Sequence, residues 1–176
     1  MMTHPKFIDV DGIGTHYLDK GSGEVLLLVH GSHMGTPDAC ESAIDWEFNF
    51  DVLAQSFRVI AMDKLGQGYT GNPKSDADYT MAATVKHAAG LLQALGLENV
   101  HVIGHSRGGY VVTRLTLDHP ELVRSCVIVD SGTLAPGRRR RNSLWPTRPS
   151  PASAAQASAG ASSITLSGRI TSRRIG

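Results

Sequence analysis

Four short apolar runs, and the helical segments between them, constrain the fold of this chain more than any other feature. The runs at residues 25–29, 58–62, 100–104 and 125–130 read VLLLV, RVIAM, VHVIG and SCVIVD. Strands that are buried on both faces of a parallel sheet have this continuous apolar pattern. Between the runs, apolar residues recur at helical spacing, as Trp46, Phe50 and Leu53 do. We therefore predict βαβ units with right-handed connections and a mostly parallel sheet.

The remaining elements follow from local patterns. KFIDV and THYLDK, separated by DGIG, are typical of an antiparallel hairpin at the N-terminus. A helix is predicted up to Gly96, because five preceding apolar residues share one face, namely Met81, Val85, Ala88, Leu92 and Leu95. Another helix is predicted over residues 107–119, before Pro120. The sequence therefore indicates an α/β fold of about six strands flanked by helices.

The distribution of charge divides the chain at about Pro136. Residues 1–136 contain 9 Lys and Arg against 16 Asp and Glu, whereas residues 137–176 contain 8 Arg and no acidic residue. The second segment is rich in Arg, Ser, Ala and Pro and has almost no helical or strand periodicity, which indicates low-complexity sequence. We predict a folded part over residues 1–136 and a disordered tail over residues 137–176. The tail is either a native basic extension or an out-of-frame reading of GC-rich coding DNA.

Cysteine content and hydropathy favour a soluble, cytoplasmic protein. Cys40 and Cys126 are the only cysteines, and Cys126 lies in an apolar run, which favours buried free thiols over a disulfide or a metal site. The N-terminus has no apolar stretch after a basic one, and no window approaches the roughly 18 apolar residues of a membrane span. We expect no cofactor, no metal, and no membrane or nucleic-acid partner.

The strongest chemical motif is GHSRG at residues 104–108, which matches G-x-S-x-G. An apolar run precedes it and a helical segment follows, so Ser106 is predicted to be a nucleophile at the apex of a sharp strand-to-helix turn. Acyl transfer also needs two N–H donors for the oxyanion. The backbone N–H groups of Ser32 and Arg107 are the candidates. The alternatives are a turn serine that matches by chance and an ordinary loop at His30 and Gly31.

Three motifs in order resemble the α/β-hydrolase superfamily over about residues 6–135. They are VHGS after the first buried run, DKLGQGYT after the second, and GHSRGG after the third. Within the superfamily, HGSHMG and GHSRGGY are most similar to the meta-cleavage product hydrolases, which split a C–C bond in 2-hydroxy-6-oxo-dienoates. The resemblance implies an incomplete α/β-hydrolase fold and a small-molecule ester or dienoate substrate. It also implies that the run at residues 125–130 is an unpaired edge, where the complete fold has a seventh strand.

The superfamily order is nucleophile, acid and then histidine. Asp130 is a candidate acid, but no histidine follows it. The last one, His119, is at the far end of the predicted helix, roughly 20 Å from Ser106 at 1.5 Å per residue. His33, in the loop after the first buried run, is the remaining candidate base, although no third group is evident to orient its ring. Other histidines are predicted to be structural or solvated, namely His4, His16, His87, His101 and His105.

Three functional hypotheses follow. The chain is a serine hydrolase by descent with impaired catalysis, or an inactive truncated or frameshifted product. The third hypothesis is a binding module whose RRRR segment contacts nucleic acid or an anionic membrane. Arginine clusters without interleaved aromatic residues are more often solvated, which disfavours the third hypothesis. The sequence leaves the substrate and the oligomeric state open.

Overall fold

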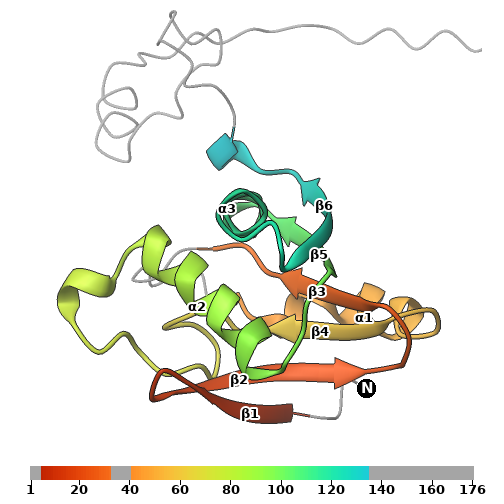
Figure 1. Ribbon diagram of the computed structural model, residues 1–176, viewed down its shortest axis with the longest axis horizontal. Helices are drawn as coiled ribbons and strands as arrows, with labels where there is room; N and C mark the ends of the chain where they lie inside the picture. Colours follow the sequence, from red (N-terminus) through yellow and green to blue (C-terminus); the bar gives the residue numbers. More distant parts are fainter. Residues whose placement is uncertain (1–4, 33–40, 135–176) are drawn as a thin grey trace, which may run out of the picture. The chain divides into compact units, whose positions relative to one another are not determined.

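The computed structural model describes residues 5–32 and 41–134, which form one sheet with helices on both of its faces (Figure 1). The strands are β1 (Pro5–Val10), β2 (Ile13–Lys20), β3 (Val25–Val29), β4 (Arg58–Met62), β5 (Val100–His105) and β6 (Val123–Val129). The α-helices are α1 (Glu47–Leu53), α2 (Met81–Ala94) and α3 (Arg107–Asp118). Short 3-10 helices are η1 (Ala43–Trp46), η2 (Asp76–Asp78) and η3 (Gly132–Leu134).

The sheet has six strands in the order β1-β2-β4-β3-β5-β6. β1 and β2 form the predicted antiparallel hairpin, and β2 is also antiparallel to β4. The other three pairings are parallel, so the prediction of a mostly parallel α/β sheet is confirmed. β3 pairs directly with β5, with Val29 opposite Gly104. This pairing brings the loop after β3 next to the turn after β5.

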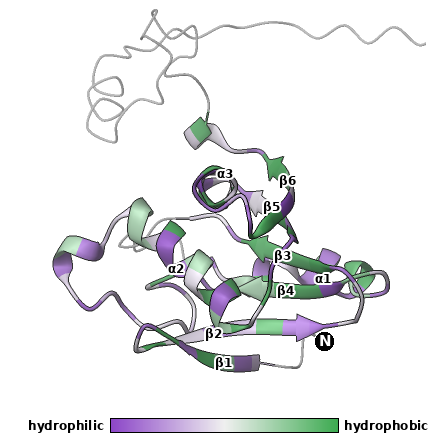
Figure 2. Cartoon of the chain, viewed as in Figure 1, coloured by the Kyte–Doolittle hydropathy of each residue, from purple (hydrophilic) through white to green (hydrophobic). Residues whose placement is uncertain are grey.

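The apolar runs are continuous because both faces of the central strands are buried. Alternate residues such as Leu27 and Ile60 belong to a cluster that includes residues of α2 and α3. Their neighbours Leu28 and Ala61 belong to a second cluster with Phe50 of α1. Figure 2 shows the resulting concentration of hydrophobic residues in β3 and β4.

Helix α2 begins and ends where its sequence predicts. The Thr80 side chain accepts a hydrogen bond from the backbone N–H of Ala83, and Gly96 follows the C-terminal turn in a left-handed conformation. The buried face is wider than the predicted apolar stripe because it includes His87, whose Nε2 lies 2.9 Å from Thr15 Oγ1. His87 is thus a buried structural residue. No helix in the described residues is long and apolar enough to cross a membrane.

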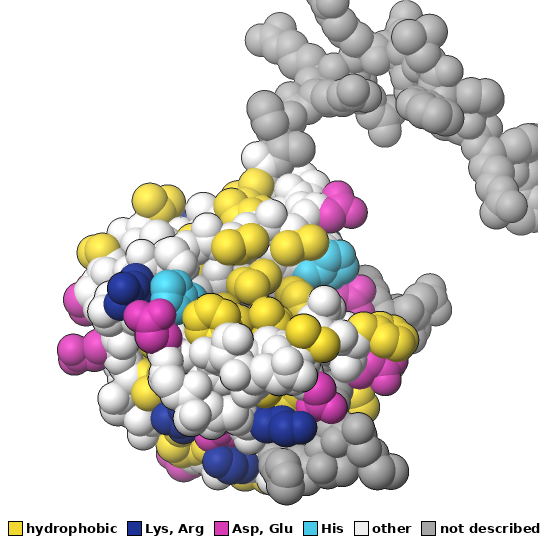
Figure 3. All heavy atoms as spheres, turned by 90° about the vertical axis from the view of Figure 1, so that its right-hand side faces the viewer, with side chains coloured by type: hydrophobic (Ala, Val, Ile, Leu, Met, Phe, Trp, Pro, Cys, Tyr) yellow, Lys and Arg dark blue, Asp and Glu magenta, His cyan; other side chains and the backbone are white. Residues whose placement is uncertain are grey.

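β6 is the last strand of the sheet in the described part of the chain. It begins at Val123, two residues earlier than predicted, and three consecutive apolar side chains on it are exposed: Val127 by 49%, Ile128 by 48% and Val129 by 41%. Figure 3 shows hydrophobic side chains gathered on the side of the molecule where Figure 1 draws β6. Among residues 5–32 and 41–134, β6 pairs with β5 alone. The predicted boundary at Pro136, the tail and Cys40 lie outside these residues.

Candidate active site

Ser106 occupies the sharp turn between β5 and α3 in a strained backbone conformation. Its φ of 51° and ψ of −117° lie in a region that residues other than glycine rarely adopt. Three hydrogen bonds maintain it: the Ser106 N–H donates to Val129 O at 2.9 Å, and Ser106 O accepts from Gly109 N at 3.0 Å and from Ser131 Oγ at 2.6 Å. The turn is thus fixed by the first turn of α3 and by the end of β6.

The two glycines of the G-x-S-x-G motif permit close packing around the turn. A Cβ on Gly104 would clash with the backbone of Gly108, and a Cβ on Gly108 would clash with the carbonyl oxygens of Val29 and His30. Only glycine at both positions lets α3 start directly over the ends of β3 and β5. The motif therefore has a physical basis in this fold, beyond its match to a pattern.

The loop after β3 lies against Ser106. The point where a Cβ would stand on Gly31 is 3.1 Å from Ser106 Cβ and 3.1 Å from His105 Nδ1. Ser32 follows with a φ of 65°. The backbone N–H of Ser32 therefore belongs to the segment that meets the nucleophile turn, and the N–H of Arg107 is in the first turn of α3. N–H groups at a helix start have no partner within the helix, which suits them to bind an anion.

The side chains of His30 and Lys64 donate hydrogen bonds to two consecutive backbone carbonyls of this loop. His30 Nδ1 donates to Gly31 O at 3.0 Å, and Lys64 Nζ donates to Ser32 O at 3.0 Å. The backbone N–H of Lys64 donates to His30 Nε2 at 3.1 Å, which places the imidazole proton on Nδ1. Burial, assisted by the Lys64 charge, lowers the pKa of His30 to about 3, so the ring is neutral at physiological pH.

Lys64 is almost fully buried, with an exposed fraction of 2%. Burial lowers its pKa to about 8, and Arg107 also lowers it, whereas the carboxylates of Glu41 and Asp45 raise it. A buried lysine of this kind is costly unless it makes hydrogen bonds or lies near opposite charges. Ser32 O and the two carboxylates supply that compensation.

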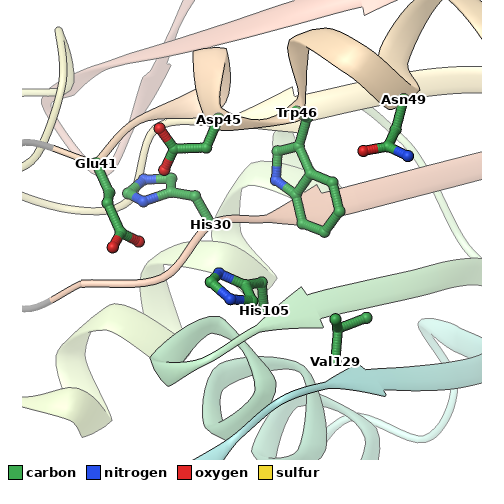
Figure 4. Close-up of a pocket in the computed structure, with 7 residues that line it drawn as sticks. All are labelled: His30, Glu41, Asp45, Trp46, Asn49, His105 and Val129. Atoms are coloured by element: carbon green, nitrogen blue, oxygen red, sulfur yellow. The ribbon is translucent and has the colours of Figure 1, made fainter. Parts of the chain in front are cut away.

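A cavity of about 420 Å³ opens on the α1 side of the sheet beside the nucleophile turn (Figure 4). It is lined by His30, Glu41, Asp45, Trp46, Asn49, His105 and Val129. Partial burial and then the Glu41 charge raise the pKa of Asp45. His30, Glu41 and Asp45 each offer an atom within 4.8 Å of the others, a spacing that could suit a metal ion. Both ring nitrogens of His30 are already engaged in hydrogen bonds, so we propose no metal centre there.

The remaining predicted site residues lie in different places. Asp130 is exposed, between Val129 and Ser131, which both bond to the backbone of Ser106. His119 follows the last residue of α3, at the opposite end of the helix from Ser106. His33 lies outside the described residues.

Sequence reasoning missed Glu41 and Lys64. Lys64 lies two residues after β4, within DKLGQG, and lysines are almost never fully buried unless paired, so its local sequence does not indicate that it is buried. Glu41 follows a loop without periodicity, so only the structure brings it to the site. Gly31, two residues after the end of β3, is the sequence feature that could have indicated the close approach of another segment of the chain.

The chain matches the family model described as the α/β hydrolase fold over residues 24–169. It is 38% identical over 140 residues to the 2-hydroxymuconate semialdehyde hydrolase of Pseudomonas sp. strain CF600, which covers 79% of this chain and 48% of that protein. It is 34% identical over 130 residues to the 2-hydroxy-6-oxo-6-(2'-aminophenyl)hexa-2,4-dienoic acid hydrolase of Metapseudomonas resinovorans, covering 73% of this chain and 43% of that protein.

Among solved structures, the fold is similar to a serine hydrolase involved in carbazole degradation, with a TM-score of 0.64 and 32% identity. The match covers 71% of this chain and 46% of that one. The chain therefore spans just under half the length of the curated relatives named above.

Proposed function

Since the chain belongs to the α/β-hydrolase family, we propose that it is a serine hydrolase by descent, with Ser106 as its nucleophile. The observation that carries this proposal is the strained backbone of Ser106 at the start of α3, a conformation that exposes a serine hydroxyl at the apex of the turn. The backbone N–H groups of Ser32 and Arg107 are the proposed oxyanion donors. The hydrogen-bonded carbonyls of Gly31 and Ser32 and the position of Arg107 in the first turn of α3 support these roles.

The proposed substrate is a small molecule with an ester bond or a C–C bond next to a ketone, as in a dienoate. Two matched relatives carry names that specify 2-hydroxymuconate semialdehyde and a 2-hydroxy-6-oxo-dienoic acid. In such a reaction the Ser106 oxygen attacks the carbonyl carbon, and the negative charge that develops on the carbonyl oxygen is stabilised by the two N–H groups.

We propose that catalysis by this chain is impaired. Asp130 is the proposed acid, but no histidine follows it in the sequence, and His119 lies at the wrong end of α3. Loss of one member of a serine triad costs on the order of 10⁴ to 10⁶ in kcat. His33, which lies outside the described residues, is the alternative base that the sequence offers.

The alternative function is that of an inactive, truncated or frameshifted product, and the composition of residues 137–176 favours it. A frameshift near codon 137 is tested on the coding DNA, since another frame should then encode two strands, an acid and a histidine. A native basic tail predicts no such frame. A binding module for nucleic acid or an anionic membrane is supported only by the eight arginines of the tail.

The test of impaired catalysis is steady-state hydrolysis of an activated ester by the full chain. We expect slow turnover that stays close to the rate in buffer but exceeds it by a measurable amount that depends on Ser106. Efficient hydrolysis that disappears in Ser106→Ala would show that the chain has a working base, and its loss in His33→Ala as well would identify His33.

A further inference from the structure

The carboxylate of Glu41 lies beside Ser106. Glu41 Oε2 and Ser106 Cβ are both within 3.1 Å of the point where a Cβ would stand on Gly31. The absent side chain of Gly31 therefore leaves the space that the carboxylate occupies. In Figure 4 the Glu41 carboxylate points toward the C-terminal end of β5, directly before Ser106.

The position of Glu41 is fixed by the residues that follow it. The backbone N–H of Ala43 donates to Asp63 Oδ1 at 2.6 Å, and the Ser42 side chain accepts from the N–H of Ile44 at the start of η1. Asp63 is itself buried after β4. Two residues downstream of Glu41, the chain is thus attached to the centre of the sheet.

Glu41 Oε2 is buried and has no hydrogen-bond partner among residues 5–32 and 41–134. A buried oxygen without a partner is costly, so such atoms are rare and call for an explanation. Two charged groups interact with Glu41: the carboxylate of Asp45 repels it, and the cation of Lys64 attracts it. His30 and His105 also line the cavity, and His30 is neutral. The unpartnered oxygen is therefore available to the hydroxyl of Ser106.

We propose that Glu41 is the base that takes the proton of Ser106 in this chain, which rests on the proposed role of Ser106 as nucleophile. The Ser106 oxygen forms a bond to the substrate carbonyl carbon while its proton passes to Glu41 Oε2. The tetrahedral intermediate then loses the leaving group, which takes this proton. Water next attacks the acyl carbon, gives a proton to Glu41, and releases the carboxylic acid, and the proton returns to Ser106.

The test uses the full chain and p-nitrophenyl acetate, with the rate of Ser106→Ala subtracted to give the Ser106-dependent rate. Glu41→Gln should lower this rate to the level of Ser106→Ala, because a general base ordinarily contributes about 10²-fold or more. The matched control is Glu47→Gln, an exposed carboxylate at the start of α1, which should leave the rate unchanged. Circular dichroism and the thermal midpoint verify that both variants fold.

Chemical rescue separates a base from a structural residue. In Glu41→Ala, added formate should recover a substantial part of the Ser106-dependent rate, because it can occupy the vacated space and accept the proton. A full rate in Glu41→Gln, or a folded Glu41→Ala that formate does not rescue, would overturn the proposal. Equal rates in wild type and Ser106→Ala would instead overturn the proposed nucleophile, and the role of Glu41 with it.

Discussion

The imidazole Nδ1 of His16 donates a hydrogen bond of 2.7 Å to the carboxylate of Asp63, and both side chains are buried. The same carboxylate accepts from the backbone N–H of Ala43 at 2.6 Å and of Tyr69 at 2.8 Å. Thr70 Oγ1 donates to Asp63 O and accepts from the N–H of His16. These bonds connect β2, the turn after β4 and η1, so the motif DKLGQGYT at residues 63–70 has a structural role.

Replacement of Asp63 by Ala should therefore destabilise the fold strongly. It leaves a buried imidazole and two N–H groups without their acceptor, and breaking a buried pair of this kind costs about 3–5 kcal/mol. Urea denaturation measures the change in the free energy of unfolding. Asp118→Asn, which breaks the exposed pair with Arg114, is the control and should cost less than about 1 kcal/mol. Similar losses in the two variants would contradict the structural role of Asp63.

Lys64 should make stability depend on pH above neutrality. Its pKa is lowered by burial to about 8, against a usual value of 10.5. Between these two values the unfolded chain holds a proton that the folded chain has released, so the stability of the wild type should rise with pH. The slope is no more than about 1.4 kcal/mol per pH unit.

The comparison for this prediction is Lys64→Met, which keeps the volume of the side chain but does not titrate. The free energy of unfolding of the wild type relative to Lys64→Met should increase from pH 8 to pH 10 and stay constant from pH 6 to pH 7.5. If the difference in the free energy of unfolding between the two proteins does not change up to pH 10, Lys64 keeps its ordinary pKa in the folded chain.

Local pattern predicted most of the fold because the central strands are buried on both faces and each helix has one apolar face. VLLLV and RVIAM coincide with β3 and β4, and the turn at Ser106 coincides with its motif. The cluster of His30, Glu41 and Lys64 was not predictable, because it depends on which loops the strand order brings together. The pattern of apolar residues within each segment does not indicate that β3 lies between β4 and β5 in the sheet.

The exposed edge of β6 should make the chain prone to aggregation. Val127, Ile128 and Val129 are each more than 40% exposed, and an unpaired apolar edge can pair with another chain. We expect a thermal midpoint below about 55 °C, at the lower end of the range for mesophilic domains. Val127→Lys should reduce light scattering on heating, because a charge on an edge strand opposes pairing. A monomer that unfolds cooperatively above that temperature would contradict this expectation.

The central claim, that Ser106 is the nucleophile, is tested most directly by the site of covalent labelling. The full chain is incubated with an activated ester or a fluorophosphonate, and the adduct is located by mass spectrometry of peptides. The account predicts one adduct, on Ser106, that forms slowly and is absent in Ser106→Ala. An adduct on another residue, or none on Ser106 in the folded chain after prolonged incubation, would contradict it.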